Sequence, residues 1–283
     1  MEAFVCVACG AQYPPSEQPP AACLGCQEER QFVPGSGQQW TTLEKAHHTR
    51  FTVLRQHEPR VIGVGTEPKF GIGQRAILLQ TPHGNILWDL TPYIDETTVM
   101  MIKALGGVQM MAISHPHFYT TMVEWSKAFG DVPIYLHAAD REYVRRESPA
   151  INYWEGDTHE LVPGVTLIRA GGHFSGGTML HWAEGAEGKG IVCSADMMYI
   201  TPDNQYLTFM RSYPTFIPLS PAGAKAVVGT LDGFHYETIY GHFFDMKIES
   251  NAEEAVRKSL DRYVAAVDGR YDSESGNSAH PAL

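Results

Sequence analysis

Short apolar runs recur along the chain between residues 51 and 240, separated by polar or glycine-containing turns. Runs of four to eight residues bounded in this way are typical of β-strands. They predict strands over 51–55, 60–65, 76–80, 85–90, 109–113, 133–137, 165–170, 178–183, 190–195 and 237–240. The sequence TPHGN between the third and fourth of these runs indicates a hairpin turn.

Segments with the helical period alternate with these strands. They predict helices over 95–105, 120–129, 138–147, 221–231 and 251–267. The last is the clearest, because one face carries Val256, Leu260, Tyr263, Val264 and Val267. Ser250 and Glu253 have the spacing of a capping box at its start. Strand pairs come first and mixed strand–helix units follow, so the pattern predicts an α/β protein with two sheets sandwiched between helices.

Composition and charge narrow the functional classes. The 283 residues are 43% hydrophobic, enough for one large domain with a small appendage. The formal net charge of −11 argues against nucleic-acid or anionic-membrane partners. The basic cluster 141–146 is interleaved with acidic residues, as on a solvated helix face. No apolar run approaches the roughly 18 residues needed to span a bilayer, and the start lacks a signal-peptide pattern. We therefore expect a cytoplasmic protein with neither nucleic-acid nor membrane partners.

The chain divides into four parts. Residues 1–34 are rich in cysteine and proline, and residues 35–49 look like a linker. Residues 50–270 contain the predicted strands and helices and form the main domain. Residues 271–283 are small and polar, so we expect a disordered tail.

The cysteines of the first part predict a structural metal centre. Cys6/Cys9 and Cys23/Cys26 form two Cys-x-x-Cys pairs separated by 13 residues. Four converging thiolates with no open position suit a structural zinc ion, without which so small a segment rarely folds. The segment resembles a zinc ribbon or a shortened rubredoxin knuckle pair, and its short spacing favours zinc over iron. Cys193 lies in an apolar run and is predicted to be strand core.

Metal-capable side chains also follow predicted strands in the main domain. They are His115, His117, His173, Asp196 and His242. Strand ends can converge in a sheet fold, and loops held by a rigid scaffold are where sites are built. The five side chains therefore predict a second metal centre.

Over about residues 50–245 the order of these motifs resembles the metallo-β-lactamase superfamily. Asp89 in LWDLTP matches its opening Asp motif, and HPHFYT (115–120) aligns with its His-x-His-x-Asp-His motif. GGHFSGG, SAD and YGH supply the later His173, Asp196 and His242. The resemblance implies an αββα sandwich with the metal site at one edge. We interpret Asp89 as a structural carboxylate that accepts hydrogen bonds beneath that site.

The chain departs from the superfamily at two positions. Tyr119 and Thr120 stand where the motif has its Asp and second-site His. By family roles, one metal keeps His115, His117 and His173, whereas a second would keep only Asp196 and His242, so we expect a mononuclear centre. A three-histidine metal with an open position would lower the pKa of bound water to about 7 and polarise a substrate oxygen.

The role of the missing Asp, which orients the attacking water, would fall to Asp196, His242 or Tyr119. Asp196 and Tyr119 are therefore the catalytic candidates, and His242 is either a ligand or a hydrogen-bond partner of one.

These features favour a zinc-dependent hydrolase acting on an ester, lactone, thioester or amide. An alternative is a non-haem iron oxygenase of the persulfide-dioxygenase type, in which His115, His173 and Asp196 form a two-histidine, one-carboxylate face. Two further alternatives are an electron-transfer protein with iron in the cysteine knuckles and a non-catalytic binding protein on the same scaffold. We expect the two metal centres to be independent, so that loss of the cysteine centre leaves the main domain its own metal.

Overall fold

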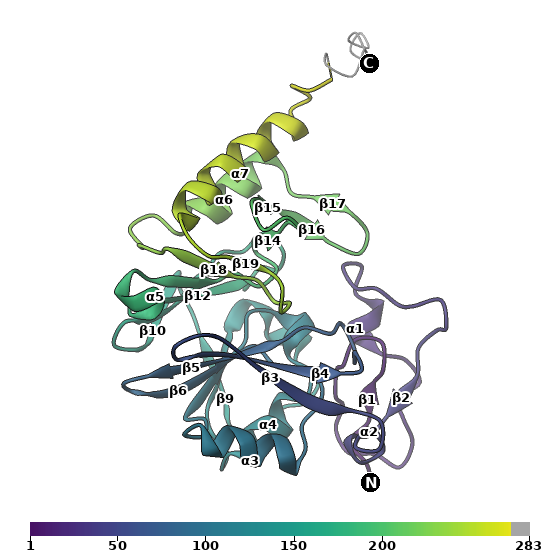
Figure 1. Ribbon diagram of the computed structural model, residues 1–283. Coiled ribbons are helices and arrows are strands. Elements are labelled where there is room, and N and C mark those ends of the chain that lie inside the picture. Colours follow the sequence, from purple (N-terminus) through teal and green to yellow (C-terminus); the bar gives the residue numbers. More distant parts are fainter. Residues whose placement is uncertain (273–283) are drawn as a thin grey trace.

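Two β-sheets pack face to face, and helices cover the outer face of each (Figure 1). The computed structural model describes residues 1–272. The predicted disordered tail lies outside the described residues from position 273 onward. The layer order helix–sheet–sheet–helix is the αββα sandwich, so the predicted fold class is confirmed.

The first sheet is built from the earlier half of the main domain. Its strands, neighbours in chain order, are β3 (Phe51–Glu58), β4 (Val61–Glu67), β5 (Ala76–Thr81), β6 (Gly84–Trp88), β7 (Met110–Ala112), β8 (Ile134–His137) and β9 (Ile151–Trp154). Strands β3 to β6 pair antiparallel, and β6 to β9 pair parallel. The predicted hairpin is confirmed, because Thr81 pairs with Gly84, whose φ of 112° favours glycine. Strand β9 was not predicted.

The second sheet contains the later strands in the order β10-β11-β12-β13-β18-β19. They are β10 (Thr158–Val162), β11 (Val165–Arg169), β12 (Thr178–Trp182), β13 (Ile191–Cys193), β18 (Thr238–Tyr240) and β19 (Lys247–Ile248). A buried cluster that includes Trp88, Leu180, Trp182 and Tyr240 fills the space between the two sheets. Cys193 belongs to this cluster and is fully buried, as predicted.

The helices cover the outer faces. Helices α3 (Glu96–Ala104) and α4 (Met122–Ala128) pack on the first sheet, and α6 (Pro221–Gly229) and α7 (Ala252–Val267) pack on the second (Figure 1). Helix α3 ends before Gly106 and Gly107, both with positive φ, as the sequence predicts. The short helix α5 (Gly185–Gly188) and the strand pairs β14 (Tyr199–Ile200) with β15 (Leu207–Thr208) and β16 (Met210–Ser212) with β17 (Ile217–Pro218) complete the main domain.

The start of α7 differs from the prediction. Its N-cap is Asn251, in the left-handed region at φ 54°, and the Asn251 side chain makes no capping hydrogen bond. The Glu253 carboxylate instead accepts a hydrogen bond from the Tyr236 backbone N–H, so the capping box was wrong. Val267 at the other end is 42% exposed and lies outside the buried face.

The predicted helix 138–147 is also wrong. Residues Ala138–Tyr143 form a short 3₁₀ segment, η2, interrupted at Asp140, and Val144 after it is extended. The basic cluster is only partly solvated: Arg141 is exposed, whereas Arg146 Nη1 donates to Glu124 Oε1 and to Gln12 Oε1, both at 2.5 Å. The helical period predicted the wrong structure here because residues 138–147 pack against the N-terminal part of the chain, to which Gln12 belongs.

The N-terminal segment lies beside the main domain (Figure 1). It contains β1 (Val5–Cys6), α1 (Leu24–Gln27), β2 (Trp40–Thr41) and α2 (Leu43–Ala46). Strand β1 pairs antiparallel with β2, so part of the predicted linker 35–49 belongs to the same small sheet as the first cysteine pair. Within residues 1–272, none of the helices combines the length and the apolar character that crossing a membrane requires.

Candidate metal centre

Three histidines and one aspartate converge at one edge of the sandwich. His115 and His117 follow β7, His173 lies between β11 and β12, and Asp196 follows β13. One ligand atom of each lies within 4.8 Å of those of the others. Pro116 begins the 3₁₀ turn η1 (Pro116–Phe118), and this turn brings the two flanking imidazoles to a ring-centroid distance of 5.2 Å.

The facing atoms of this cluster can all donate an electron pair. His115 Nε2 lies 3.3 Å and His173 Nε2 3.7 Å from Asp196 Oδ2, and His117 Nδ1 lies 3.3 Å from His173 Nε2. His115 Nε2 is buried and has no hydrogen-bond partner among the described residues. A buried polar atom without a partner is costly unless something else binds it. Three imidazole nitrogens and a carboxylate oxygen around one point fit a transition-metal ion.

The electrostatics of the cluster favour the ligand-competent protonation states. Burial lowers the pKa of His115 to about 4 and lowers that of His173 well below its usual value. Burial alone would raise the pKa of Asp196, but the imidazoles of His242, His115 and His173 hold it well below its usual value. Neutral imidazoles and an ionised carboxylate are the forms that bind metals.

His242 lies beside the cluster. Its Nδ1 is 3.0 Å from Asp196 Oδ1, whereas the histidines of the cluster face Oδ2. Asp196 therefore uses one oxygen toward the cluster and the other toward His242. The ring is buried between Phe243 and Tyr199, at centroid distances of 4.3 and 5.3 Å.

Asp89 contacts the histidine cluster indirectly, through Ser114. Its Oδ1 accepts the Ser114 backbone N–H at 2.8 Å, and the Ser114 hydroxyl lies 2.8 Å from His115 Nδ1. Burial raises the pKa of Asp89 to about 7, although the hydrogen bonds from Ser114 oppose this. The chain from Asp89 through Ser114 fixes the orientation of the His115 ring, consistent with the structural interpretation of this carboxylate.

Tyr119 and Asp196 line different cavities. The Tyr119 side chain is 6% exposed, packs in the core of the first sheet with Met122 and Val123, and borders a cavity between η1 and the N-terminal segment. The cavity that contains Asp196 is not lined by Tyr119, although His117 lines both. The catalytic role of Tyr119 stays a prediction.

We expect Tyr119→Phe to change turnover less than about twofold and the free energy of unfolding by less than about 0.5 kcal/mol, because the side chain is outside the lining of the Asp196 cavity and its hydroxyl makes no identified hydrogen bond within residues 1–272. Steady-state kinetics and urea unfolding measure the two effects. A loss of turnover beyond tenfold with normal stability would support Tyr119 as a catalytic residue.

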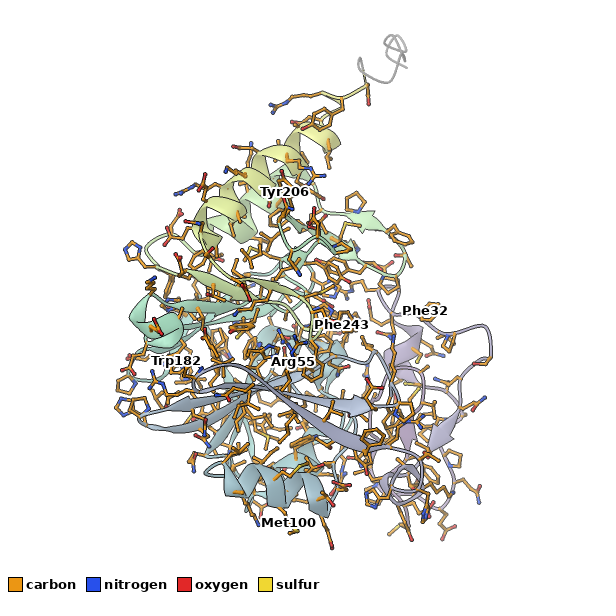
Figure 2. All side chains as sticks on the ribbon, in the orientation of Figure 1. Phe32, Arg55, Met100, Trp182, Tyr206 and Phe243 are labelled. Carbon is orange, nitrogen blue, oxygen red and sulfur yellow. The ribbon has the colours of Figure 1, made fainter. Side chains whose placement is uncertain are left out.

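The cavity above the histidine cluster has a volume of about 570 Å³. His117, His173, Asp196 and His242 are among its lining residues, with Tyr199, Tyr213 and Phe243 from the second half of the main domain. The N-terminal segment contributes Val7, Ala8, Phe32 and Pro34. Figure 2 labels Phe32 and Phe243, which reach this region from the N-terminal segment and from the loop after β18. The lining is largely apolar and aromatic, as in sites for small organic molecules.

The four cysteines also converge. Cys6 Sγ lies 3.5 Å from Cys26 Sγ and Cys9 Sγ 3.6 Å from Cys23 Sγ, and the four sulfurs lie within 4.8 Å of one another. None of them forms a disulfide. The Tyr13 hydroxyl donates to Cys23 Sγ at 3.4 Å, as expected beside an electron-rich thiolate. Four sulfurs at such distances fit a single tetrahedral ion.

The sequence did not point to two residues that lie near the histidine cluster. Glu28 and Arg30 belong to the N-terminal segment, yet Glu28 Oε2 lies 3.9 Å from His117 Nε2 and Arg30 Nη1 donates to the His173 carbonyl oxygen at 2.8 Å. No local motif marks them, because their partners lie about 90 and 143 residues away in the sequence.

The fold and the cluster together define a protein with the metallo-β-lactamase fold. The structure of VMB-1 aligns with a TM-score of 0.57 at 10% identity over 76% of this chain and 97% of that one. A B3 metallo-β-lactamase described as the first with an active-site glutamic acid aligns with a TM-score of 0.50 at 12% identity over 84% of this chain and 97% of that one. At these identities the likeness establishes the fold alone.

A closer relative in sequence is the uncharacterized protein YmaE of Bacillus subtilis (strain 168). It is 40% identical over 269 residues, which are 94% of this chain and 97% of YmaE. The chain therefore belongs to the same family as YmaE. No protein-family profile matches the sequence.

Proposed function

We propose that this protein is a metal-dependent hydrolase that directs a water molecule at an ester, lactone, thioester or amide of a small organic substrate. One observation carries the proposal. Three imidazole nitrogens and the Asp196 carboxylate face one point at the base of a largely apolar cavity, and His115 Nε2 there has no hydrogen-bond partner within residues 1–272.

His115, His117 and His173 would hold the ion and would leave one coordination position open for water. A zinc ion at such a position polarises a substrate oxygen and makes water acidic enough to attack at neutral pH. Asp196 is the nearest carboxylate and would accept a hydrogen bond from the attacking water and orient it. His242 lies at the other carboxylate oxygen and holds Asp196 in this orientation.

The walls of the cavity would select the substrate. Tyr199, Tyr213 and Phe243 offer aromatic surface on one side, and Phe32 and Pro34 offer apolar surface on the other. Lys69 is a cationic group in the same lining. This composition favours a substrate with an apolar body, because the organic part displaces water from the walls on binding.

A single ion at the histidine cluster is the stoichiometry we propose. Tyr119 and Thr120 replace two ligands that a second ion would use, and Thr120 Oγ1 contacts the Thr91 carbonyl oxygen instead. With one ion at the four cysteines, the protein would bind about two zinc ions per chain.

Elemental analysis of protein purified without added metal, combined with a panel of esters, lactones, thioesters and amides, tests the proposal. We expect about two zinc ions per chain and turnover of at least one substrate class that disappears on chelation and returns with zinc. Iron at the histidine cluster together with oxygen consumption would contradict the proposal and favour the oxygenase alternative. A zinc-loaded protein inactive on the whole panel would favour the non-catalytic alternative.

A further inference from the structure

The carboxylate of Glu28 is held rigidly at the end of α1. Arg30 Nε donates to Glu28 Oε1 at 2.8 Å, and the Arg30 backbone N–H donates to Oε2 at 2.9 Å. The Arg30 Nη2 atom approaches Oε1 to 2.7 Å, and the two side chains are only 9% and 13% exposed. A shielded carboxylate with both oxygens bonded keeps a single orientation.

The same carboxylate faces the Nε2 side of the His117 ring, whereas the Nδ1 side faces the histidine cluster. Glu28 Oε2 lies 3.9 Å from His117 Nε2, an ion-pair distance longer than a hydrogen bond. His117 Nε2 is buried and has no hydrogen-bond partner among residues 1–272. The other ring nitrogen, Nδ1, faces His173 Nε2 and the cluster. The two nitrogens of one imidazole thus face a fixed anion and a candidate metal position.

Arg30 attaches the same structural unit to a second candidate ligand. Its Nη1 donates to the His173 carbonyl oxygen at 2.8 Å, and its guanidinium carbon lies 3.7 Å from the centre of the Phe174 ring. Its Nη2 donates to the Tyr143 hydroxyl at 3.1 Å. The Arg30 carbonyl oxygen also accepts a hydrogen bond from Ser212 Oγ. Glu28 therefore faces the ring of one candidate ligand, and Arg30 binds the backbone of another.

A neutral imidazole carries one proton, on Nδ1 or on Nε2. Only the nitrogen without the proton can bind a metal, so the partner of the other nitrogen decides which one is available. A negative charge beside Nε2 stabilises the N–H bond there by electrostatic attraction, and this leaves the Nδ1 electron pair directed at the cluster. The low exposure of both groups strengthens the attraction, because little water screens it.

We propose that Glu28 is a positioning residue for the histidine metal centre, contributed by the four-cysteine segment, and that it sets the His117 tautomer whose Nδ1 binds the ion. The proposal rests on the metal-binding role of the histidine cluster proposed above. It assigns the N-terminal segment a function in metal binding in addition to its own folding.

The position of Glu28 depends on the four-cysteine centre. Cys23 directly precedes α1, Cys26 lies within it, and Glu28 is the residue that ends it. Glu28 is thus two residues from a thiolate of that centre, and an ion bound there fixes the short helix that carries the carboxylate. On this basis α1 would couple the two candidate metal centres, whereas the sequence predicted that they are independent.

Glu28→Gln tests the proposal, because it keeps the size of the side chain and removes the charge. Zinc affinity would be measured on the fully loaded protein by competition with a chelator, with both centres resolved. We expect the variant to bind zinc about 10–100-fold more weakly at the histidine centre, the usual effect of losing a partner of a ligating histidine. Zinc at the four cysteines should be unchanged.

Glu29→Gln is the matched control. It makes the same chemical change one residue away, on a side chain that is 64% exposed and pairs with Arg211 instead of a histidine. We expect its zinc affinity at both centres to equal that of the parent. An equal loss in both variants would overturn the proposal, since it would show an effect of net charge alone.

A second measurement needs no variant. Nitrogen-15 NMR of the imidazole rings in the zinc-loaded parent should show His117 with its proton on Nε2. A proton on Nδ1 would overturn the proposal even if Glu28→Gln did not fold. Unchanged zinc affinity in a folded Glu28→Gln would also overturn it but leave the proposed function intact. A parent that binds no zinc at the histidines would overturn both.

Discussion

Asp196→Asn is expected to lower turnover by at least about 100-fold while the protein stays folded. This loss exceeds the usual effect of removing a residue that only hydrogen-bonds to a metal ligand. Asp196 is the carboxylate that faces both the histidine cluster and His242, so the variant loses the group proposed to orient water. The amide keeps the volume of the carboxylate, and this preserves packing. Initial rates on the substrate found by the panel, with circular dichroism as a check of folding, measure the effect.

Asp245→Asn provides the control for this experiment, because it removes one negative charge from a side chain that is 91% exposed and pairs with Arg55 outside the cavity. It should keep the parental rate. A folded Asp196→Asn protein with parental turnover and metal content would contradict the assigned role of Asp196.

Cys23→Ser is expected to have the largest effect on structure. It removes one of four thiolates, so the N-terminal ion should be lost, and structural zinc sites in small peptides contribute roughly 10–16 kcal/mol of binding free energy to folding. We expect residues 1–42 to become accessible to protease. Because α1 carries Glu28, we also expect zinc at the histidine cluster to bind about 10–100-fold more weakly.

Elemental analysis, chelator competition and limited proteolysis measure these three effects. Cys193→Ser is the matched control, since this fifth cysteine lies in the core between the sheets and belongs to neither group of candidate ligands. It should keep both zinc ions, whatever its cost in stability. A Cys23→Ser protein with its full metal content would contradict the four-cysteine assignment, and one that loses only the N-terminal ion would show that the two centres are independent.

Much of the fold could be predicted because the burial pattern of the strands is local information. Strands β5 and β6 are apolar runs that flank a tight turn, and this pattern predicts a hairpin. The turn then fixes which residues of the two strands pair. Helix 251–267 was predicted within one residue, but its capping box was wrong because Glu253 binds the Tyr236 backbone instead. A cap competes with tertiary partners that the local sequence does not contain.

The prediction of a helix over residues 138–147 was wrong for a related reason. Its composition suits a solvated helix, yet Arg146 is held by Glu124 and Gln12, from α4 and from the N-terminal segment. Helical propensity contributes only fractions of a kcal/mol per residue, so a partly buried charged hydrogen bond of about 1.5–3 kcal/mol can override it.

The sequence by itself determined which residues could bind metal. Each of His115, His117, His173 and Asp196 follows an apolar strand, and the paired Cys-x-x-Cys spacing already encodes a four-sulfur cluster. Only the tertiary structure decided how these groups are oriented and what surrounds them. It placed Tyr119 in the lining of a different cavity from that of Asp196, brought Glu28 within 3.9 Å of His117, and made the N-terminal segment one wall of the Asp196 cavity. Those relations depend on contacts between residues up to 182 positions apart. The packing of whole layers, not local periodicity, determines which distant side chains meet.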